Sequence, residues 1–333
     1  MKSAIEGDDL NAGWRETRIR YTARLLRQVI VHSVFPRSFL SPRYWPTWLF
    51  IGLLRLLALL PRDAGWRVGA MIGALAYRLL RRRRSVAQVN LAICFRDLSA
   101  AERDALVRAT FRSTGIAFME IAWAWWAPST PMPIRFIGEE HLRAALAQGR
   151  GVLLLGGHYT PLELSGRHFS QINPVAALYR PHNNALLDWM IVRQRARFCT
   201  PIDRQDLRAV RRQLKSNGVV WLAPDQDFGY RNTEFVPFFG QTAATLTMPT
   251  RLAQLNDSVV LFLRHHRETD GYVLEMTPIP DFGAATLSED AELYNRMLEQ
   301  AIRQHPEQYL WLHQRFKTQP DGRRKLYRAS GGE

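Results

Sequence analysis

Short apolar segments alternate with helix-like segments over the C-terminal two thirds of the chain, and this alternation constrains the fold most strongly. The first two apolar segments are IRFI at 134–137 and VLLL at 152–155, with the helix-like EEHLRAALA between them. Similar segments follow at 175–178, 219–222, 258–263 and 272–276. Buried strands separated by helices predict an α/β fold, with a mixed, mostly parallel sheet covered by helices. In such a fold, functional side chains collect at the carboxyl ends of the strands.

The N-terminal part has a different character. Residues 1–43 are polar and basic, and they lack the apolar run and cleavage site of a signal peptide. An apolar stretch at 45–60 contains Arg55 and is shorter than the roughly 20 residues of a comfortable membrane span. A second amphipathic stretch, 64–80, ends in the basic run 81–84. We expect these segments to be membrane-associated helices that either span once or lie in one leaflet. The alternative is a buried helical hairpin of a soluble domain.

A long helix is predicted after this region, at 99–126. Ser99 followed by Glu102 forms a capping box, which marks its start. Its aromatic end, with Trp123, Trp125 and Trp126, could line an acyl-chain pocket, but an aromatic core is the more common arrangement. We therefore divide the chain into four parts. They are a basic N-terminal extension (1–43), a membrane-associated helical segment (44–84), a catalytic domain (85–325) and a tail (326–333).

Charge and cysteine content narrow the possible partners. The chain has 45 Lys and Arg against 30 Asp and Glu, which gives a net charge of +15. Such an excess predicts a polyanionic partner, meaning nucleic acid, an anionic membrane, a phosphorylated lipid or an acidic protein. The two cysteines, Cys94 and Cys199, exclude a disulfide framework and a cysteine-rich metal site. A reducing compartment is the simplest interpretation.

The strongest candidate site follows the apolar segment at 152–155. His158 comes directly after Gly156 and Gly157, and Glu163 follows five residues later, near the start of the next helix. Histidine suits a general base, and a carboxylate at that helix start can accept its other ring N–H and orient it. The chain contains no G-x-S-x-G motif, which counts against a serine hydrolase. The pair therefore favours direct attack by a substrate hydroxyl.

A histidine followed five residues later by a carboxylate occurs a second time in the chain. Either histidine could instead be a buried structural residue. His265 is followed by Asp270, but Asp270 and Gly271 lie between two strand-like runs and predict a hairpin turn. The context therefore favours His158 as the functional histidine.

Polar side chains that follow other strands are candidates for substrate binding. Arg180 either binds a phosphate or a developing oxyanion or forms a surface ion pair, and Asn183 and Asn184 lie in the same loop. Asp203 and Arg204 precede a helix whose basic face is either simply solvated or docks an acidic carrier. The basic residues of that helix are Arg208, Arg211, Arg212 and Lys215.

Two carboxylates follow the apolar segment at 219–222. Asp225 and Asp227 are two residues apart, a spacing that can ligate a metal ion. Other metal-type ligands are missing from the neighbouring sequence. We therefore interpret both residues as structural or substrate-orienting.

Four motifs, in this order, resemble the late acyltransferases of lipid A biosynthesis, the lauroyl/myristoyl branch of the lysophospholipid acyltransferase-like enzymes. The motifs are GGHYTPLELSGR, YRPHNNALLDW, APDQDFG with FVPFFG, and HPEQYLWLHQRFKT, and NLAICF at 90–95 agrees as well. The resemblance covers about residues 40–320. It implies a glycerolphosphate acyltransferase-like fold and makes the catalytic domain an acyltransferase domain.

The resemblance also implies roles for individual residues. His158 is the general base that deprotonates a hydroxyl on an acyl chain of a phosphorylated, Kdo-lipid IVA-type lipid A precursor, and Glu163 orients His158. The hydroxyl attacks an acyl thioester of acyl carrier protein, with Arg180 supporting the transition state or a phosphate. The resemblance implies neither a metal nor an organic cofactor. The enzyme is then expected at the inner (cytoplasmic) membrane, in contact with its lipids, with the catalytic domain on the cytoplasmic side.

Two other classes of protein remain as alternatives. A glycerophospholipid acyltransferase would use the same histidine with a glycerol-based acceptor and acyl-CoA or acyl carrier protein as the donor. A non-catalytic membrane- or nucleic-acid-binding protein would explain the charge, but not the polar residues that follow successive strands. No nucleic-acid-binding module is visible in the sequence, so we expect no nucleic-acid partner.

Overall fold

The computed structural model describes residues 35–127, 132–322 and 325–327. Most of the predicted N-terminal extension and the end of the predicted tail lie outside the described residues.

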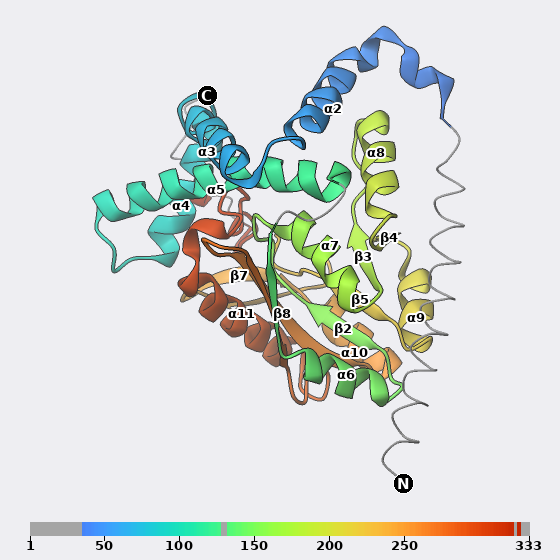
Figure 1. Ribbon diagram of the computed structural model, residues 1–333. Coiled ribbons are helices and arrows are strands. Elements are labelled where there is room, and N and C mark those ends of the chain that lie inside the picture. The colour runs from blue at the N-terminus through green and yellow to red at the C-terminus, as the bar shows by residue number, and fades with distance from the viewer. Residues whose placement is uncertain (1–34, 128–131, 323–324, 328–333) are drawn as a thin grey trace.

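A seven-stranded sheet forms the centre of the molecule, with the strand order β1-β9-β8-β2-β5-β3-β4 (Figure 1). Every neighbouring pair is parallel except β8 and β9, which form an antiparallel hairpin. The predicted mixed, mostly parallel sheet is therefore confirmed, and so is the turn at Asp270. The strands are β1 (Ile134–Ile137), β2 (Val152–Leu155), β3 (Val175–Tyr179), β4 (Thr200–Asp203), β5 (Val219–Leu222), β8 (Val259–Arg267) and β9 (Tyr272–Pro278).

Helices cover both faces of this sheet because the central strands are apolar on both sides. In β2, Leu153 and Leu155 belong to one buried cluster, whereas Val152 and Leu154 belong to another. This is the two-residue period of a strand. The first face is covered by α9 (Leu207–Lys215), α10 (Met248–Asn256) and α11 (Leu287–Gln304). The second is covered by α6 (Glu139–Ala147), α7 (Leu162–Ile172) and α8 (Ala185–Arg195).

In the described part of the chain four α-helices precede the sheet, and two of them, α3 and α5, are packed unusually closely. The four are α2 (Trp45–Leu57), α3 (Arg62–Leu79), α4 (Arg81–Cys94) and α5 (Ala100–Trp126). A Cβ atom on Gly73 would lie 2.1 Å from the carbonyl oxygen of Phe111, and one on Gly115 would lie 2.1 Å from that of Gly69. Only glycine permits this approach of two helix backbones. One side of α3 is therefore integral to the folded body.

The opposite sides of α2 and α3 carry exposed apolar side chains. Leu49, Leu53 and Leu56 are 76%, 54% and 65% exposed on α2, and Met71 and Leu75 are 69% and 56% exposed on α3. Among the residues that the structure describes, no helix combines the length and the apolar character needed to cross a bilayer.

The capping box at the start of α5 is confirmed, but a second, two-stranded sheet was not predicted. Ser99 Oγ accepts a hydrogen bond from the backbone of Glu102, and the Glu102 carboxylate accepts one from the backbone of Ser99. The extra hairpin joins β6 (Thr233–Phe238) to β7 (Gln241–Leu246) through Phe239 and Gly240, both with positive φ. Phenylalanine rarely adopts this conformation, so the sequence carries no turn signal here. Short 3₁₀ turns complete the fold at Arg37–Leu40, Pro42–Tyr44, Pro306–Gln308 and Lys325–Tyr327.

Candidate active site

His158 is held by a buried carboxylate from the neighbouring strand. The strands β2 and β5 are paired in parallel, with Leu155 opposite Leu222, so the turns that follow them emerge side by side. The ring Nδ1 of His158 lies 2.5 Å from Asp225 Oδ1, and the backbone N–H of His158 donates to Asp225 Oδ2 at 2.8 Å. Asp225 is only 2% exposed. Its carboxylate therefore fixes both the ring and the backbone of His158.

The ionisation of Asp225 determines which ring nitrogen of His158 carries the proton. Burial alone would raise the pKa of Asp225, but the charge and the two hydrogen bonds of His158 outweigh burial and lower this pKa to about 2. An ionised carboxylate can only accept hydrogen bonds, so the proton must lie on Nδ1 of the histidine. Nε2 of the neutral ring then has a free lone pair and can act as a base.

Glu163 does not have the orienting contact that the sequence predicted. Its Oε1 accepts a hydrogen bond from Trp125 Nε1 at 2.7 Å, and its Oε2 accepts one from the guanidinium of Arg195 at 2.7 Å. A buried carboxylate is best stabilised by a two-pronged guanidinium contact, which a single imidazole N–H cannot match. In the structure Asp225, and not Glu163, therefore makes the carboxylate contact to the ring of His158.

The contacts of Glu163 with Arg195 and Trp125 connect three helices. Burial raises the pKa of Glu163, but the charge and hydrogen bonds of Arg195 and the hydrogen bond of Trp125 give a net lowering. Trp125 lies at the end of α5, Glu163 in the first turn of α7 and Arg195 in the last turn of α8. Arg195 was not singled out from the sequence, because nothing local shows that the end of α8 meets the start of α7.

The first of the two glycines before His158 has a steric explanation. A Cβ atom on Gly156 would lie 2.6 Å from Nε1 of Trp221, in the adjacent strand β5. The carbonyl oxygen of Gly156 also accepts a hydrogen bond from the hydroxyl of Tyr294 at 2.7 Å. Glycine thus allows the chain to leave β2 tightly against β5.

A C-terminal segment, residues 305–318, crosses the turn that carries His158, and we call it the strap. Tyr309 pairs with Tyr159 in an isolated antiparallel bridge. On one side of this bridge the N–H of Leu310 donates to the carbonyl oxygen of His158 at 3.0 Å. The strap therefore holds the backbone of His158 in place from the side opposite Asp225. Its sequence, HPEQYLWLHQRFKT, was noticed only through the family resemblance.

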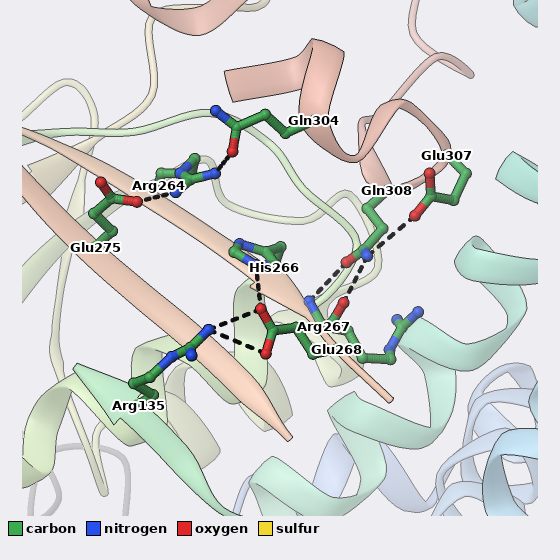
Figure 2. A network of polar contacts seen from close by, with 9 residues as sticks. All are labelled: Arg135, Arg264, His266, Arg267, Glu268, Glu275, Gln304, Glu307 and Gln308. Atoms are coloured by element: carbon green, nitrogen blue, oxygen red, sulfur yellow. Dashed lines mark hydrogen bonds and ion pairs between the residues drawn. The ribbon is translucent and has the colours of Figure 1, made fainter. Parts of the chain in front are cut away.

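Figure 2 shows how the strap is anchored to the end of the β8–β9 hairpin. The side-chain amide of Gln308 accepts a hydrogen bond from the backbone N–H of Arg267 at 2.8 Å and donates to its carbonyl oxygen at 2.9 Å. The neighbouring Glu268 forms an ion pair with Arg135 of β1. The guanidinium of Arg267 in turn pairs with buried Glu120 of α5, at 2.6 Å. The strap is thus tied to the end of β8 and, through Arg267, to α5.

The strap also fastens the second aspartate. Asp227 Oδ2 accepts a hydrogen bond from the backbone of Thr318 at 2.6 Å, and Oδ1 accepts one from the Thr318 hydroxyl at 2.7 Å. The backbone N–H of Asp227 donates to Nε2 of His313 at 3.1 Å. These contacts give Asp227 a structural role. The sequence predicted either this role or the orientation of a substrate.

A cavity of about 1020 Å³ runs from His158 to the protein surface. One part is apolar and is lined by Leu154, Phe169, Val175, Ala177, Ile191 and Phe198. Another part carries cationic side chains, namely those of Arg180, Arg204, Arg231 and Lys317. The cavity can therefore accommodate a molecule with both a hydrocarbon portion and an anionic portion.

The remaining predicted site residues fall into two groups. Arg180 and Arg204 line the cavity, as His158, Glu163 and Asp227 also do. Asn183, Asn184 and Asp203 are not among the described residues of its wall. Asn184 instead caps α8, accepting from the backbones of Leu186 and Leu187, and its side chain donates to Thr47 of α2. Asp203 accepts a hydrogen bond from the backbone of Gln205 in a turn, and Asn183 contacts Arg180.

His265, the alternative histidine, is a buried group in the cavity wall. Both of its ring nitrogens lack a hydrogen-bond partner in the described part of the chain, and burial lowers its pKa to about 3. It has no carboxylate partner comparable to Asp225. Within the same described residues, no three or more His, Cys, Asp or Glu side chains form a group that could hold a metal ion.

Comparison with known proteins identifies the family. Residues 33–318 match the family model described as bacterial lipid A biosynthesis acyltransferase. The chain belongs to this family. It is 40% identical over 299 residues to a lipid A biosynthesis palmitoleoyltransferase of Escherichia coli K12, an alignment covering 88% of this chain and 98% of the relative. It is 39% identical to the lauroyltransferase of that organism, over 86% and 96% of the two chains, and 28% identical to the myristoyltransferase, over 88% and 94%.

The chain is therefore an acyltransferase of lipid A biosynthesis, a part of lipopolysaccharide synthesis. The relatives differ in the acyl chain in their names, so membership of the lipid A acyltransferase family leaves the chain length open.

Proposed function

We propose that this lipid A acyltransferase transfers a fatty acyl chain from acyl carrier protein to a hydroxyl group on an acyl chain of a phosphorylated, Kdo-lipid IVA-type precursor. The observation that carries the proposal is the pairing of His158 with the ionised carboxylate of Asp225 beside a cavity that is apolar in one part and cationic in another. An activated thioester needs only positioning and base catalysis, so no further cofactor is required by this reaction.

The chemistry follows from the tautomer of His158. Nε2 removes the proton of the acceptor hydroxyl while the hydroxyl oxygen attacks the thioester carbonyl carbon. The resulting imidazolium is stabilised by Asp225, 2.5 Å from Nδ1. Collapse of the tetrahedral intermediate breaks the carbon–sulfur bond, and the departing thiolate takes the proton from His158. One ester forms, one thioester is lost and the histidine returns to its neutral state.

The two parts of the cavity suit the two portions of the substrates. Leu154, Phe169 and Ala177 offer an apolar wall for an acyl chain. Arg180 directly follows β3, Arg204 directly follows β4, and both are exposed. Their guanidinium groups can bind the phosphates of the acceptor or a developing oxyanion.

We also propose that α2 and α3 lie in one leaflet of the inner membrane, with the catalytic domain on the cytoplasmic side. The 13 residues of α2 form a helix of about 20 Å, shorter than the roughly 30 Å hydrocarbon core. Its exposed leucines can instead enter the interface alongside those of α3. An acceptor that resides in the bilayer would then reach the cavity without leaving the membrane surface.

Mass spectrometry of a reconstituted reaction tests the proposal. The full chain is mixed with a tetra-acylated, phosphorylated lipid A precursor that carries its inner sugars, and with acyl carrier proteins charged with chains of different lengths. We expect a single added acyl mass that is absent with His158→Ala. No added mass on this acceptor, together with acylation of a glycerophospholipid acceptor, would move the enzyme to the phospholipid branch.

A further inference from the structure

Helix α9 presents a basic stripe on its outer side. Val210 and Leu214 are fully buried against the sheet. The exposed residues at i, i+3, i+4 and i+7 share the other side of the helix, and all four are cationic. They are Arg208, Arg211, Arg212 and Lys215.

None of these four side chains forms an ion pair within the described part of the chain. Some exposed arginines on other helices are paired, such as Arg143 with Glu139 in α6 and Arg296 with Glu292 in α11. Four like charges on nine residues of helix repel one another, so the stripe costs some stability while it has no partner. An acidic partner would remove this repulsion.

The stripe begins at the mouth of the cavity. Leu207, the first residue of α9, is 43% exposed and lines the cavity together with Phe228, which is 40% exposed. Two cationic side chains of the cavity wall, Arg204 and Arg231, are exposed at the same mouth, and the Arg204 guanidinium lies 5.7 Å from the centre of the Phe228 ring. Exposed apolar side chains ringed by charged ones are the usual anatomy of a protein–protein interface.

We propose that the stripe of α9 and the mouth formed by Leu207 and Phe228 are the docking surface for the acidic acyl carrier protein. This inference rests on the proposed function, which requires a carrier-bound thioester. The carrier is too large to enter the cavity, so its body must stay outside while its prosthetic arm carries the thioester towards His158. A negatively charged helix of the carrier complements the stripe, and Arg204 and Arg231 meet the phosphate of the arm.

The position of α9 favours a protein partner over a membrane. Figure 1 shows α9 well away from α2 and α3, whose exposed leucines form the apolar surface proposed to contact the bilayer. The helix also covers the opposite face of the sheet from α8, the helix whose cap is tied to α2. Beyond Leu207, α9 exposes no large apolar side chain that could insert into lipid.

Charge reversal tests the docking surface. Arg208→Glu/Arg211→Glu is compared with the parent in two transfer reactions, one with acyl carrier protein as donor and one with S-acyl-pantetheine, which has the same thioester without the protein. We expect the ratio of kcat/KM for the carrier to kcat/KM for the small donor to fall at least about tenfold. The parental advantage of the carrier donor should also weaken as salt is raised. The matched control, Arg143→Glu/Arg296→Glu, makes the same change of net charge on α6 and α11 and should keep the parental ratio.

Binding measurements with the carrier and with vesicles distinguish a carrier-docking role of α9 from a membrane contact. We expect the α9 variant to bind acyl carrier protein more weakly and to bind vesicles of anionic phospholipid as the parent does. Weaker vesicle binding with an unchanged donor ratio would identify α9 as a membrane contact and overturn the inference. An unchanged donor ratio with unchanged vesicle binding would overturn it as well. Absence of transfer by the parent from either donor would instead contradict the proposed function.

Discussion

His158 and Asp225 occupy matching positions beyond two register-paired strands. Leu155 of β2 lies opposite Leu222 of β5, and each of the two functional residues follows its leucine by three positions. Parallel pairing therefore delivers both turns to the same edge of the sheet, where the imidazole and the carboxylate meet at 2.5 Å. The contact between His158 and Asp225 is a consequence of the sheet topology rather than of proximity in the sequence.

The ion pair between Glu163 and Arg195 should be important for stability. Glu163→Ala leaves the guanidinium of Arg195, whose side chain is 27% exposed, without its buried carboxylate, and we expect a loss of about 3 kcal/mol in the free energy of unfolding. Urea denaturation measures this loss. The double variant Glu163→Ala/Arg195→Met removes both charges and should recover much of it. Parental stability of the single variant would contradict the structural role given to Glu163.

The apolar part of the cavity should set the length of the acyl chain. Ala177 of β3 lies in the cavity wall, so Ala177→Leu fills space there with three additional carbon atoms. We expect the preferred donor to become shorter by about two to four carbons, since an added methylene group in a filled pocket is worth about 1–3 kcal/mol. Competition between acyl carrier proteins of different chain lengths measures the preference. An unchanged preference would place the chain elsewhere.

The exposed leucines of α2 should carry much of the membrane affinity. We expect Leu49→Gln/Leu53→Gln/Leu56→Gln to weaken binding to phospholipid vesicles at least about tenfold, because each side chain gains about 1.5–3 kcal/mol on full burial in an apolar environment. Sedimentation with vesicles measures the binding. Leu255→Gln is the control, because Leu255 is 61% exposed on α10, far from α2 in the sequence. Equal effects of both variants would argue against a specific membrane face.

Acidification should destabilise the protein through buried neutral histidines such as His168. Burial lowers the pKa of His168 to about 4, from an ordinary value of 6.5. Between these values the unfolded chain binds more protons than the folded one, so this contribution to stability is complete above pH 6.5 and is lost as the pH falls towards 4. Each such histidine contributes a slope of up to about 1.4 kcal/mol per pH unit.

Chemical denaturation at a series of pH values measures that slope. His168→Leu should make the pH dependence of stability shallower by the contribution of about one bound proton. A remaining slope is expected from His265, His266 and His313, because burial lowers the pKa of each of them too. A variant with the parental slope would show that His168 does not contribute.

The sequence predicted the sheet well because its central strands are apolar on both faces, as Val152 to Leu155 are. It missed β4, where Pro201 interrupts the apolar pattern, and the hairpin that turns at Phe239. The predicted site contained both His158 and Asp225, but the orienting role was assigned to Glu163 because that residue is close in the chain. The order of strands in the sheet, which brings β5 beside β2, cannot be read from a local pattern.

Single-turnover rates of variants at Asp225 and Glu163 show which of the two carboxylates orients His158. The enzyme, in excess over its substrates, is mixed with lipid A precursor and acyl carrier thioester, and the product is followed by mass spectrometry. The reaction is run with the parent, with Asp225→Asn and with Glu163→Gln. We expect Asp225→Asn to lower the rate by about 10²–10⁴ with an unchanged fold, because the wrong tautomer is held and the imidazolium loses its partner. Glu163→Gln, which keeps the shape of the side chain, should lower the rate far less. A near-parental rate for Asp225→Asn together with an inactive Glu163→Gln would contradict the assignment of Asp225 as the residue that orients His158.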